Sequence, residues 1–285
     1  MQPILFRVGP LPVYSYGFFY GLGIVVAMAV VERRARLRGL DTHKVLDLCL
    51  VALVSIIVGA RLFFVIQFAS DFRGNTLDAL KIWKGGQVLY GGLLLTVVTS
   101  MWYARHHKLD IRALGDSFAP AIPLGVGIGR IGCFMNGCCY GKVADGLPWA
   151  VEFPKLFSAS KGIIGSPAFV DHMHHGLVES SSTSSLPVHP TQLYSVVVAW
   201  ATAGLLFYLG RSTWCRGKLI WVYLGMYAAT RFAIEFFRGD NESVVLGLTI
   251  SQVVGLLVLM GLALGYWRLR RRDRLGGGPT TTPAG

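Results

Sequence analysis

The chain has 285 residues, of which 53% are hydrophobic and 15% are charged, and its mean hydropathy is +0.52. Ordinary soluble domains carry roughly 25% charged residues, so this composition excludes a soluble globular protein. The net charge of +12 lies in short clusters that flank long apolar runs. This distribution is typical of loops beside anionic lipids rather than of nucleic-acid binding.

The apolar runs predict seven membrane-spanning helices, because each approaches the length of about 20 residues that crosses a bilayer core. We therefore expect an all-α integral membrane protein. The fourth run contains Asp116, Pro120 and Pro123, and we expect it to be irregular. The predicted spans are residues 14–31, 47–67, 88–104, 113–129, 191–209, 218–237 and 247–267.

Lysine and arginine assign the two sides of the membrane. Positive charge marks cytoplasmic loops, and the basic connections all fall on one side of an alternating topology. The N-terminus is then expected outside and the C-terminus inside. Residues 1–275 would form a single membrane domain, with a small outer head at about 130–190 between spans four and five, and 276–285 would be a disordered tail. The basic connections are 32–44, 105–112, 210–218 and 268–274.

Polar side chains within the predicted spans converge on one level near the outer face. Charged residues within spans are costly, and by default they mark functional sites. Three arginines against one carboxylate leave excess positive charge, which favours an anionic ligand such as a phospholipid phosphate. Two structural alternatives stay open: Arg61 reaches the membrane interface, and Arg231 only neutralises Glu235. The residues at this level are Tyr16, Arg61, Tyr90, Arg130, Arg231 and Glu235.

The segment GVGIGRIGCFMNGCCYGK, residues 125–142, contains the pattern G-x-G-x-x-G at Gly127, Gly129 and Gly132. A dinucleotide site would need this pattern between a strand and a helix, whereas here it follows a membrane span. We therefore reject a nucleotide-binding loop. Glycines at this place instead permit close approach of a helix or a lipid head group to the backbone.

Three cysteines, Cys133, Cys138 and Cys139, follow on the outer side of the membrane. An oxidising compartment permits a disulfide, although the adjacent pair is unsuited to bridging itself. A zinc site would need better spacing, even with histidines at 172, 174 and 175. Packing thiols, a disulfide, and a metal or redox role therefore all stay open.

Six segments, in order along the chain, resemble the motifs of one family. They are SYGFFYGLG, VGARLFF, WKGGQVLYGG, GRIGCFMNGCCYG, HPTQLYS and RFAIEFFRGDNE. These segments resemble the bacterial prolipoprotein diacylglyceryl transferases, whose signature reads G-R-[IL]-G-N-F-[IL]-N-G-E-x-x-G. The signature and the last two motifs are specific, and the resemblance spans nearly the whole chain.

This resemblance implies a reaction in the bacterial inner membrane. The lipobox cysteine of a preprolipoprotein signal peptide would attack the glyceryl carbon of phosphatidylglycerol, form a thioether and release glycerol phosphate. The partners would be phosphatidylglycerol, the preprolipoprotein and membrane lipids, with no nucleic acid. No metal and no soluble cofactor is expected.

The resemblance also implies the residues of the site. Arg130 and Arg231 would bind the phosphate and stabilise charge on the leaving group, Glu235 would orient Arg231, and Tyr16 and Tyr90 would complete the catalytic set. Residues expected to contact phosphatidylglycerol are Arg61, Gly91, Gly92, Arg130, Asn136, His189 and Arg231.

Four positions depart from the family pattern. Tyr90 replaces a histidine, Cys133 an asparagine, Cys138 a glutamate and Ser195 a glutamate. Tyrosine, with an ordinary pKa near 10, is a weak base. Three accounts stay open: arginine electrostatics suffice, Tyr90 or a cysteine thiolate substitutes, or the chain is a phospholipid-binding paralogue with another acceptor or no activity. A thiol-redox protein using Cys138 and Cys139 is a third class of function.

Overall fold

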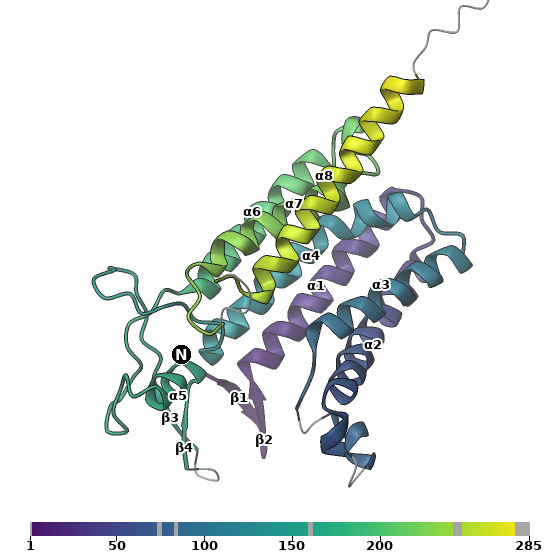
Figure 1. Cartoon of the computed structure of the whole chain (residues 1–285). Coiled ribbons are helices and arrows are strands. Elements are labelled where there is room, and N and C mark those ends of the chain that lie inside the picture. The colour runs from purple at the N-terminus through teal and green to yellow at the C-terminus, as the bar shows by residue number, and fades with distance from the viewer. Residues whose placement is uncertain (1, 73–75, 83–84, 159–161, 242–246, 277–285) are drawn as a thin grey trace, which may run out of the picture.

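The computed structural model describes residues 2–72, 76–82, 85–158, 162–241 and 247–276, and the fold is mostly helical. Long helices run side by side through the molecule, and a smaller, less regular part covers one end (Figure 1). The predicted tail lies outside the described residues except for Gly276, the last residue of α8. The helices are α1 Ser15–Leu37, α2 Thr42–Gln67, α3 Leu89–His106, α4 Ile111–Asn136, α5 Pro167–His174, α6 Thr191–Leu209, α7 Leu219–Glu235 and α8 Ile250–Gly276.

Seven of these helices coincide with the seven predicted apolar runs. Among the described residues, α1, α2, α4 and α6 are long and apolar enough to cross a membrane. The part of α8 over Ile250–Gly265 is a shorter apolar helix. The structure thus fits a helical membrane protein, with four helices that meet the requirement by length and composition.

Two short β-hairpins add to the helical architecture. Strands β1, Ile4–Val8, and β2, Leu11–Tyr14, pair antiparallel across a turn at Gly9, whose φ is +58°. Strands β3, Lys155–Ser158, and β4, Gly162–Gly165, pair antiparallel within the segment between α4 and α6. Neither hairpin is part of the expected all-α fold. Both are short pairs outside the apolar runs.

Aspartates begin two helices at the end of the bundle where the basic connections lie. Asp41 accepts hydrogen bonds from the amides of His43 and Lys44. These amides hold the pKa of Asp41 below its usual range. Asp110 caps α4 in the same way. N-cap side chains satisfy the free amides of a first helical turn. Helices α2 and α4 therefore begin at Thr42 and Ile111, a few residues before the predicted apolar runs.

Helix α4 is continuous to Asn136, which corrects the expectation that the fourth span ends near residue 129. Its glycines pack rather than form a loop: a Cβ on Gly125 would meet the carbonyl oxygen of Gly23 at 2.7 Å. Pro120 has no amide hydrogen, which frees the carbonyl of Asp116 four residues earlier. That carbonyl accepts a hydrogen bond from Arg34 Nε at 3.3 Å.

The side chain of Asp116 joins three elements at the basic end of the bundle. It is fully buried and forms an ion pair of 3.1 Å with Arg38, after the end of α1. It also accepts hydrogen bonds from the amides of Gly217 at 2.6 Å and Leu219 at 3.0 Å, at the start of α7. A buried carboxylate requires such partners, so the charge that made span four look irregular has a structural role.

Candidate functional site

The predicted site residues lie at the end of the bundle opposite Asp116. Because the long helices alternate in direction, the starts of α1, α3, α6 and α8 share this end with the last turns of α2, α4 and α7 (Figure 1). The polar residues predicted to share one level accordingly belong to one end of the molecule. The contacts within that end divide them into two groups.

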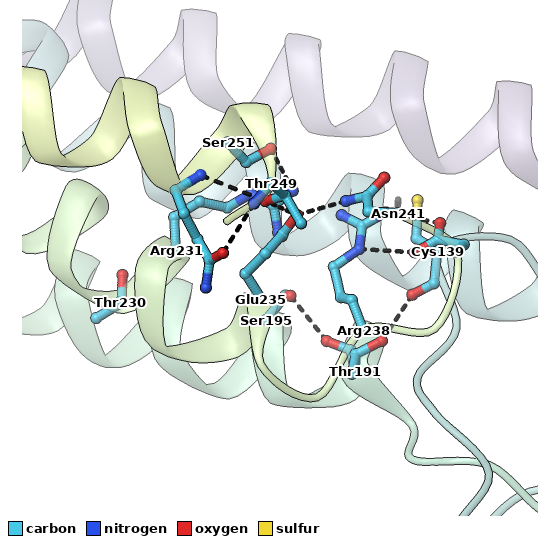
Figure 2. Close-up of polar contacts among 12 residues, drawn as sticks. Cys139, Thr191, Ser195, Thr230, Arg231, Glu235, Arg238, Asn241, Thr249 and Ser251 are labelled. Carbon is cyan, nitrogen blue, oxygen red and sulfur yellow. Dashed lines mark hydrogen bonds and ion pairs between the residues drawn. The ribbon is translucent and has the colours of Figure 1, made fainter. Parts of the chain in front are cut away.

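Glu235 forms the centre of the first group. The last residue of α7, it pairs through Oε2 with Arg231 Nη1 at 2.5 Å. Its Oε1 accepts hydrogen bonds from Asn241 Nδ2 at 2.6 Å and Thr249 Oγ1 at 2.7 Å, and the side chains converge as Figure 2 shows. Arg231 also donates to Ser251 Oγ at 3.0 Å. The spacing predicted this pair, but the three further partners follow α7 in sequence and were not predicted.

Arg238 stands beside this pair and was also not predicted as a site residue. Both its Nε and Nη2 donate to the carboxylate of Asp240, at 2.8 Å and 2.7 Å. Although burial opposes the charged form, this bidentate contact raises the pKa of Arg238 above its usual range. Its presence in RFAIEFFRGDNE, a motif already singled out, was a signal that could have identified it.

Arg130 differs from Arg61, Arg231 and Arg238 because neither a carboxylate nor a carbonyl oxygen of the described residues contacts its guanidinium. It lies on α4, nearly two turns before the helix ends, and its side chain is partly buried. Its guanidinium lies within electrostatic range of Arg231 and Arg238. Yet none of the described residues forms a hydrogen bond or an ion pair with it. Desolvating an unpaired cation is costly, so this position favours an anion.

Tyr16 and Asn136, two further predicted site residues, lie at the start of α1 and at the end of α4. Tyr16 begins the exposed face of α1 and packs on Tyr20 at 5.2 Å between ring centroids. The backbone of Tyr16 lies close to Gly132 of α4, where a Cβ would approach its carbonyl oxygen to 3.2 Å. Asn136 is the last residue of α4, and its side chain hydrogen-bonds with Cys138. Both residues therefore lie around the last turns of α4, and no described contact joins either side chain to Arg130.

Arg61 belongs to the second group, on α2 and α3. It is 7% exposed, and its hydrogen bonds to described residues all go to backbone carbonyl oxygens. Its Nε donates to Ala79 at 2.9 Å, Nη2 to Asp78 at 2.7 Å, and Nη1 to Gly85 at 2.6 Å and Gly86 at 3.0 Å. The geometry favours a structural role that holds the segment before α3.

Tyr90, Gly91 and Gly92 open α3 against α2. Tyr90 is 41% exposed, and no hydrogen bond or ring contact joins it to another described residue. Gly91 and Gly92 are buried, and a Cβ on Gly92 would meet the carbonyl oxygen of Ile56 at 2.6 Å. The glycines therefore permit close helix packing, and the described contacts do not bring Tyr90 to Arg130.

His189 and Gln192 lie around the start of α6. The carbonyl oxygen of His189 accepts a hydrogen bond from the amide of Gly141 at 2.9 Å, and its ring lies against Phe237 at 5.3 Å. Gln192 is fully buried and donates to the carbonyl oxygen of Cys138 at 2.8 Å. His189 thus links the head to the end of α7. Gln192, which stood in the motif HPTQLYS without an assigned role, supports the cysteine segment.

The three cysteines form one cluster at the end of α4. Gly137, at φ +73°, ends the helix and reverses the chain, so that Cys138 and Cys139 return toward Cys133. Their three Sγ atoms lie within 4.8 Å of one another, and all three thiols are free. The pKa of Cys139 is lowered by hydrogen bonds from the other two thiols and by the charges of Arg130 and Arg238.

Known proteins resemble this chain along nearly its full length. A family model described as prolipoprotein diacylglyceryl transferase matches residues 3–268. The phosphatidylglycerol–prolipoprotein diacylglyceryl transferase of Erwinia tasmaniensis is 31% identical over 96% of this chain and 94% of its own length. The enzymes of the same name from Stenotrophomonas maltophilia and Geobacter sulfurreducens are 32% and 30% identical, covering 93% and 95% of this chain and 90% and 97% of their own lengths.

Proposed function

The chain belongs to the prolipoprotein diacylglyceryl transferase family, and we propose that it transfers diacylglyceryl from phosphatidylglycerol to a lipobox cysteine. The observation that carries the chemistry is Arg130: a partly buried guanidinium without a carboxylate, near two further arginines. A phosphate accepts such groups bidentately. The substrates follow from the names of the relatives, and the unpaired charge supports them.

The reaction breaks one bond and forms one. The cysteine thiolate of the preprolipoprotein attacks the glyceryl carbon of the lipid, the C–S bond forms, and the C–O bond to the phosphate breaks. Glycerol phosphate leaves with the bonding electron pair. Arg130 and Arg231 hold the phosphate and stabilise this negative charge, an electrostatic contribution that needs donors fixed in advance. Glu235 supplies that fixation for Arg231, since their ion pair is buried.

The remaining predicted residues take supporting places. Tyr16 and Asn136 line the head-group pocket beside Arg130. Tyr90, at the start of α3, is assigned the removal of the thiol proton, and Arg61 positions the segment before it. Gly91 and Gly92 bring α3 close to α2. His189 holds the head against the end of α7, and Arg238 adds positive charge that its pair with Asp240 fixes in place.

The membrane arrangement proposed for this reaction has seven spans. Helices α1, α2, α3, α4, α6, α7 and α8 cross the bacterial inner membrane. The basic connections lie on the cytoplasmic side, and the N-terminus and the head near 130–190 lie on the periplasmic side. In support, the basic connections 32–44, 105–112 and 210–218 all lie at the end of the bundle opposite Arg130. The site then faces the outer leaflet, which phosphatidylglycerol and the signal peptide both reach.

Reconstitution tests the transfer directly. Purified protein in vesicles of phosphatidylglycerol is mixed with a lipobox peptide, and the peptide mass is measured. We expect a gain of one diacylglyceryl group. Arg130→Lys keeps the charge but loses a bidentate donor pair, and a lost charge-assisted hydrogen bond of about 1.5–3 kcal/mol corresponds to a loss of roughly 10–100-fold in rate. Arg33→Lys, at an exposed position on α1, is the matched control.

The departures at Tyr90, Cys133 and Cys138 favour one competing function, a phospholipid-binding paralogue. Phosphatidylglycerol that binds without any peptide mass gain would establish that function and reject the transferase. Comparison of Tyr90→Phe with Tyr90→His addresses the base. An unchanged rate in the Phe variant would remove Tyr90 from proton transfer, whereas a faster His variant would place the proton acceptor at this position.

A further inference from the structure

The cluster of Cys133, Cys138 and Cys139 has no role in the proposed transfer. It lies at the end of α4 beside Arg130, where a chain reversal gathers three thiols from seven consecutive residues. Cys133 is buried and the other two are partly buried. The described part of the chain holds no other group of three or more such ligands. The cluster therefore requires its own explanation.

We propose that these three cysteines bind one soft, closed-shell cation, Cu(I) or Zn(II), as a trigonal set of sulfur ligands. Sulfur lies about 2.3 Å from such metals, so three sulfurs around one ion stand about 4 Å apart. The three Sγ atoms already lie within 4.8 Å of one another, and small side-chain rotations complete the geometry. Thiolates select soft cations over Mg²⁺ and Ca²⁺, and the cluster includes no carboxylate.

The backbone is held in the conformation that the cluster needs. Cys139 has a φ of +59°, which is unfavourable for a residue with a side chain. Its carbonyl oxygen accepts a hydrogen bond from Thr191 Oγ1 at 2.7 Å, and that of Cys138 accepts one from Gln192. Both donors come from the first turn of α6. Strain that neighbouring residues maintain is a feature of functional sites.

The surrounding charges also suit a bound cation with thiolate ligands. Three thiolates and one cation carry net negative charge, and each thiol that binds releases a proton. Arg130 supplies an unpaired positive charge nearby, while Arg238 is already matched by Asp240.

The test is a metal titration of the full chain in detergent, without lipid substrate, under anaerobic reducing conditions. Cu(I) and Zn(II) are titrated separately against a chelator of known affinity. We expect one equivalent of at least one of the two ions, and the two arms identify which. Loss of a supporting contact around a metal costs about 10–100-fold in affinity, so Cys138→Ser and Cys139→Ser should each weaken binding by more than this.

The remaining cysteines supply the matched controls. Cys49 and Cys215 are buried elsewhere in the fold, and Cys49→Ser and Cys215→Ser should bind metal as the unmodified chain does. Circular dichroism and gel filtration show that each variant is folded. Failure of both ions to bind would overturn the proposal. Metal binding that survives the cluster substitutions would also overturn it. The proposal would fail as well if the mass of the purified protein were lower by two hydrogen atoms because two cysteines of the cluster form a disulfide. None of these outcomes bears on the transfer reaction.

Discussion

Substitution of Glu235 by glutamine tests whether the buried ion pair organises the site. The new side chain can still accept hydrogen bonds from Asn241 and Thr249, but its amide group faces the Arg231 guanidinium, and the pair is lost. Removal of one partner from a buried pair costs about 3–5 kcal/mol. Because Arg231 is 17% exposed and keeps Ser251, we expect about 2–3 kcal/mol of the free energy of unfolding to be lost.

The control is a pair with the same spacing and distance but different burial. Glu32 and Arg36 also stand four residues apart on a helix at 2.5 Å, with side-chain exposures of 34% and 70%. Exposed pairs of this kind contribute about 0.3–0.5 kcal/mol. In nanodiscs, Glu32→Gln should barely change the melting temperature, whereas Glu235→Gln should lower it by about 5–10 °C. Equal shifts for the two variants would refute the argument from burial.

Three further predictions concern packing and titration. Gly59→Ala places a Cβ 2.7 Å from the carbonyl oxygen of Gly91, and this substitution should lower the free energy of unfolding by about 1–3 kcal/mol. The control is Gly21→Ala, because a Cβ there meets open space. In the same melting assay this control should stabilise α1 by about 0.5–1 kcal/mol. The pKa of Cys139 is lowered, so the rate at which iodoacetamide alkylates it should stay nearly constant as the pH falls from about 8.5, the ordinary thiol pKa, to about 6. Peptide mapping measures this rate. A tenfold decrease in the rate per pH unit would contradict the prediction. Burial lowers the pKa of His172, with Asp171 opposing and His175 reinforcing the shift. Below about pH 6.5 the unfolded chain therefore binds the proton more readily than the folded chain, and acid destabilises the fold around His172. The amide of Leu186 donates to His172 Nδ1. Its hydrogen-exchange protection factor should decrease as the pH falls below about 6.5 and stay constant above that value.

Local patterns predicted the helices and one ion pair because both depend on short sequence separations. The apolar runs identified seven of the helices, and the spacing of Arg231 and Glu235 placed both on one face of α7. The glycine-rich segment was harder. Gly125 and Gly132 reduce helix propensity, but contacts with α1 reward a helix there, and those contacts join residues about a hundred positions apart.

The role of an arginine depends on partners that no local pattern specifies. Arg61 looked like a phosphate ligand because a charge within a span needs an anion or a partner. Its partners are the carbonyl oxygens of Asp78, Ala79, Gly85 and Gly86, which lie between α2 and α3 in the chain. Arg130 carried the same signal with a different outcome, since no carboxylate or carbonyl reaches its guanidinium among the described residues. Sequence located both charges, and only the fold distinguishes them.

The carboxylate of Glu235 has a further consequence for the way α7 and α8 meet. Asn241, six residues after Glu235, and Thr249, directly before α8, both donate to Glu235 Oε1. One oxygen atom therefore ties the end of α7 to the start of α8. The two helices cannot separate at this end of the bundle without breaking that contact, so a single acid acts as a clasp between them.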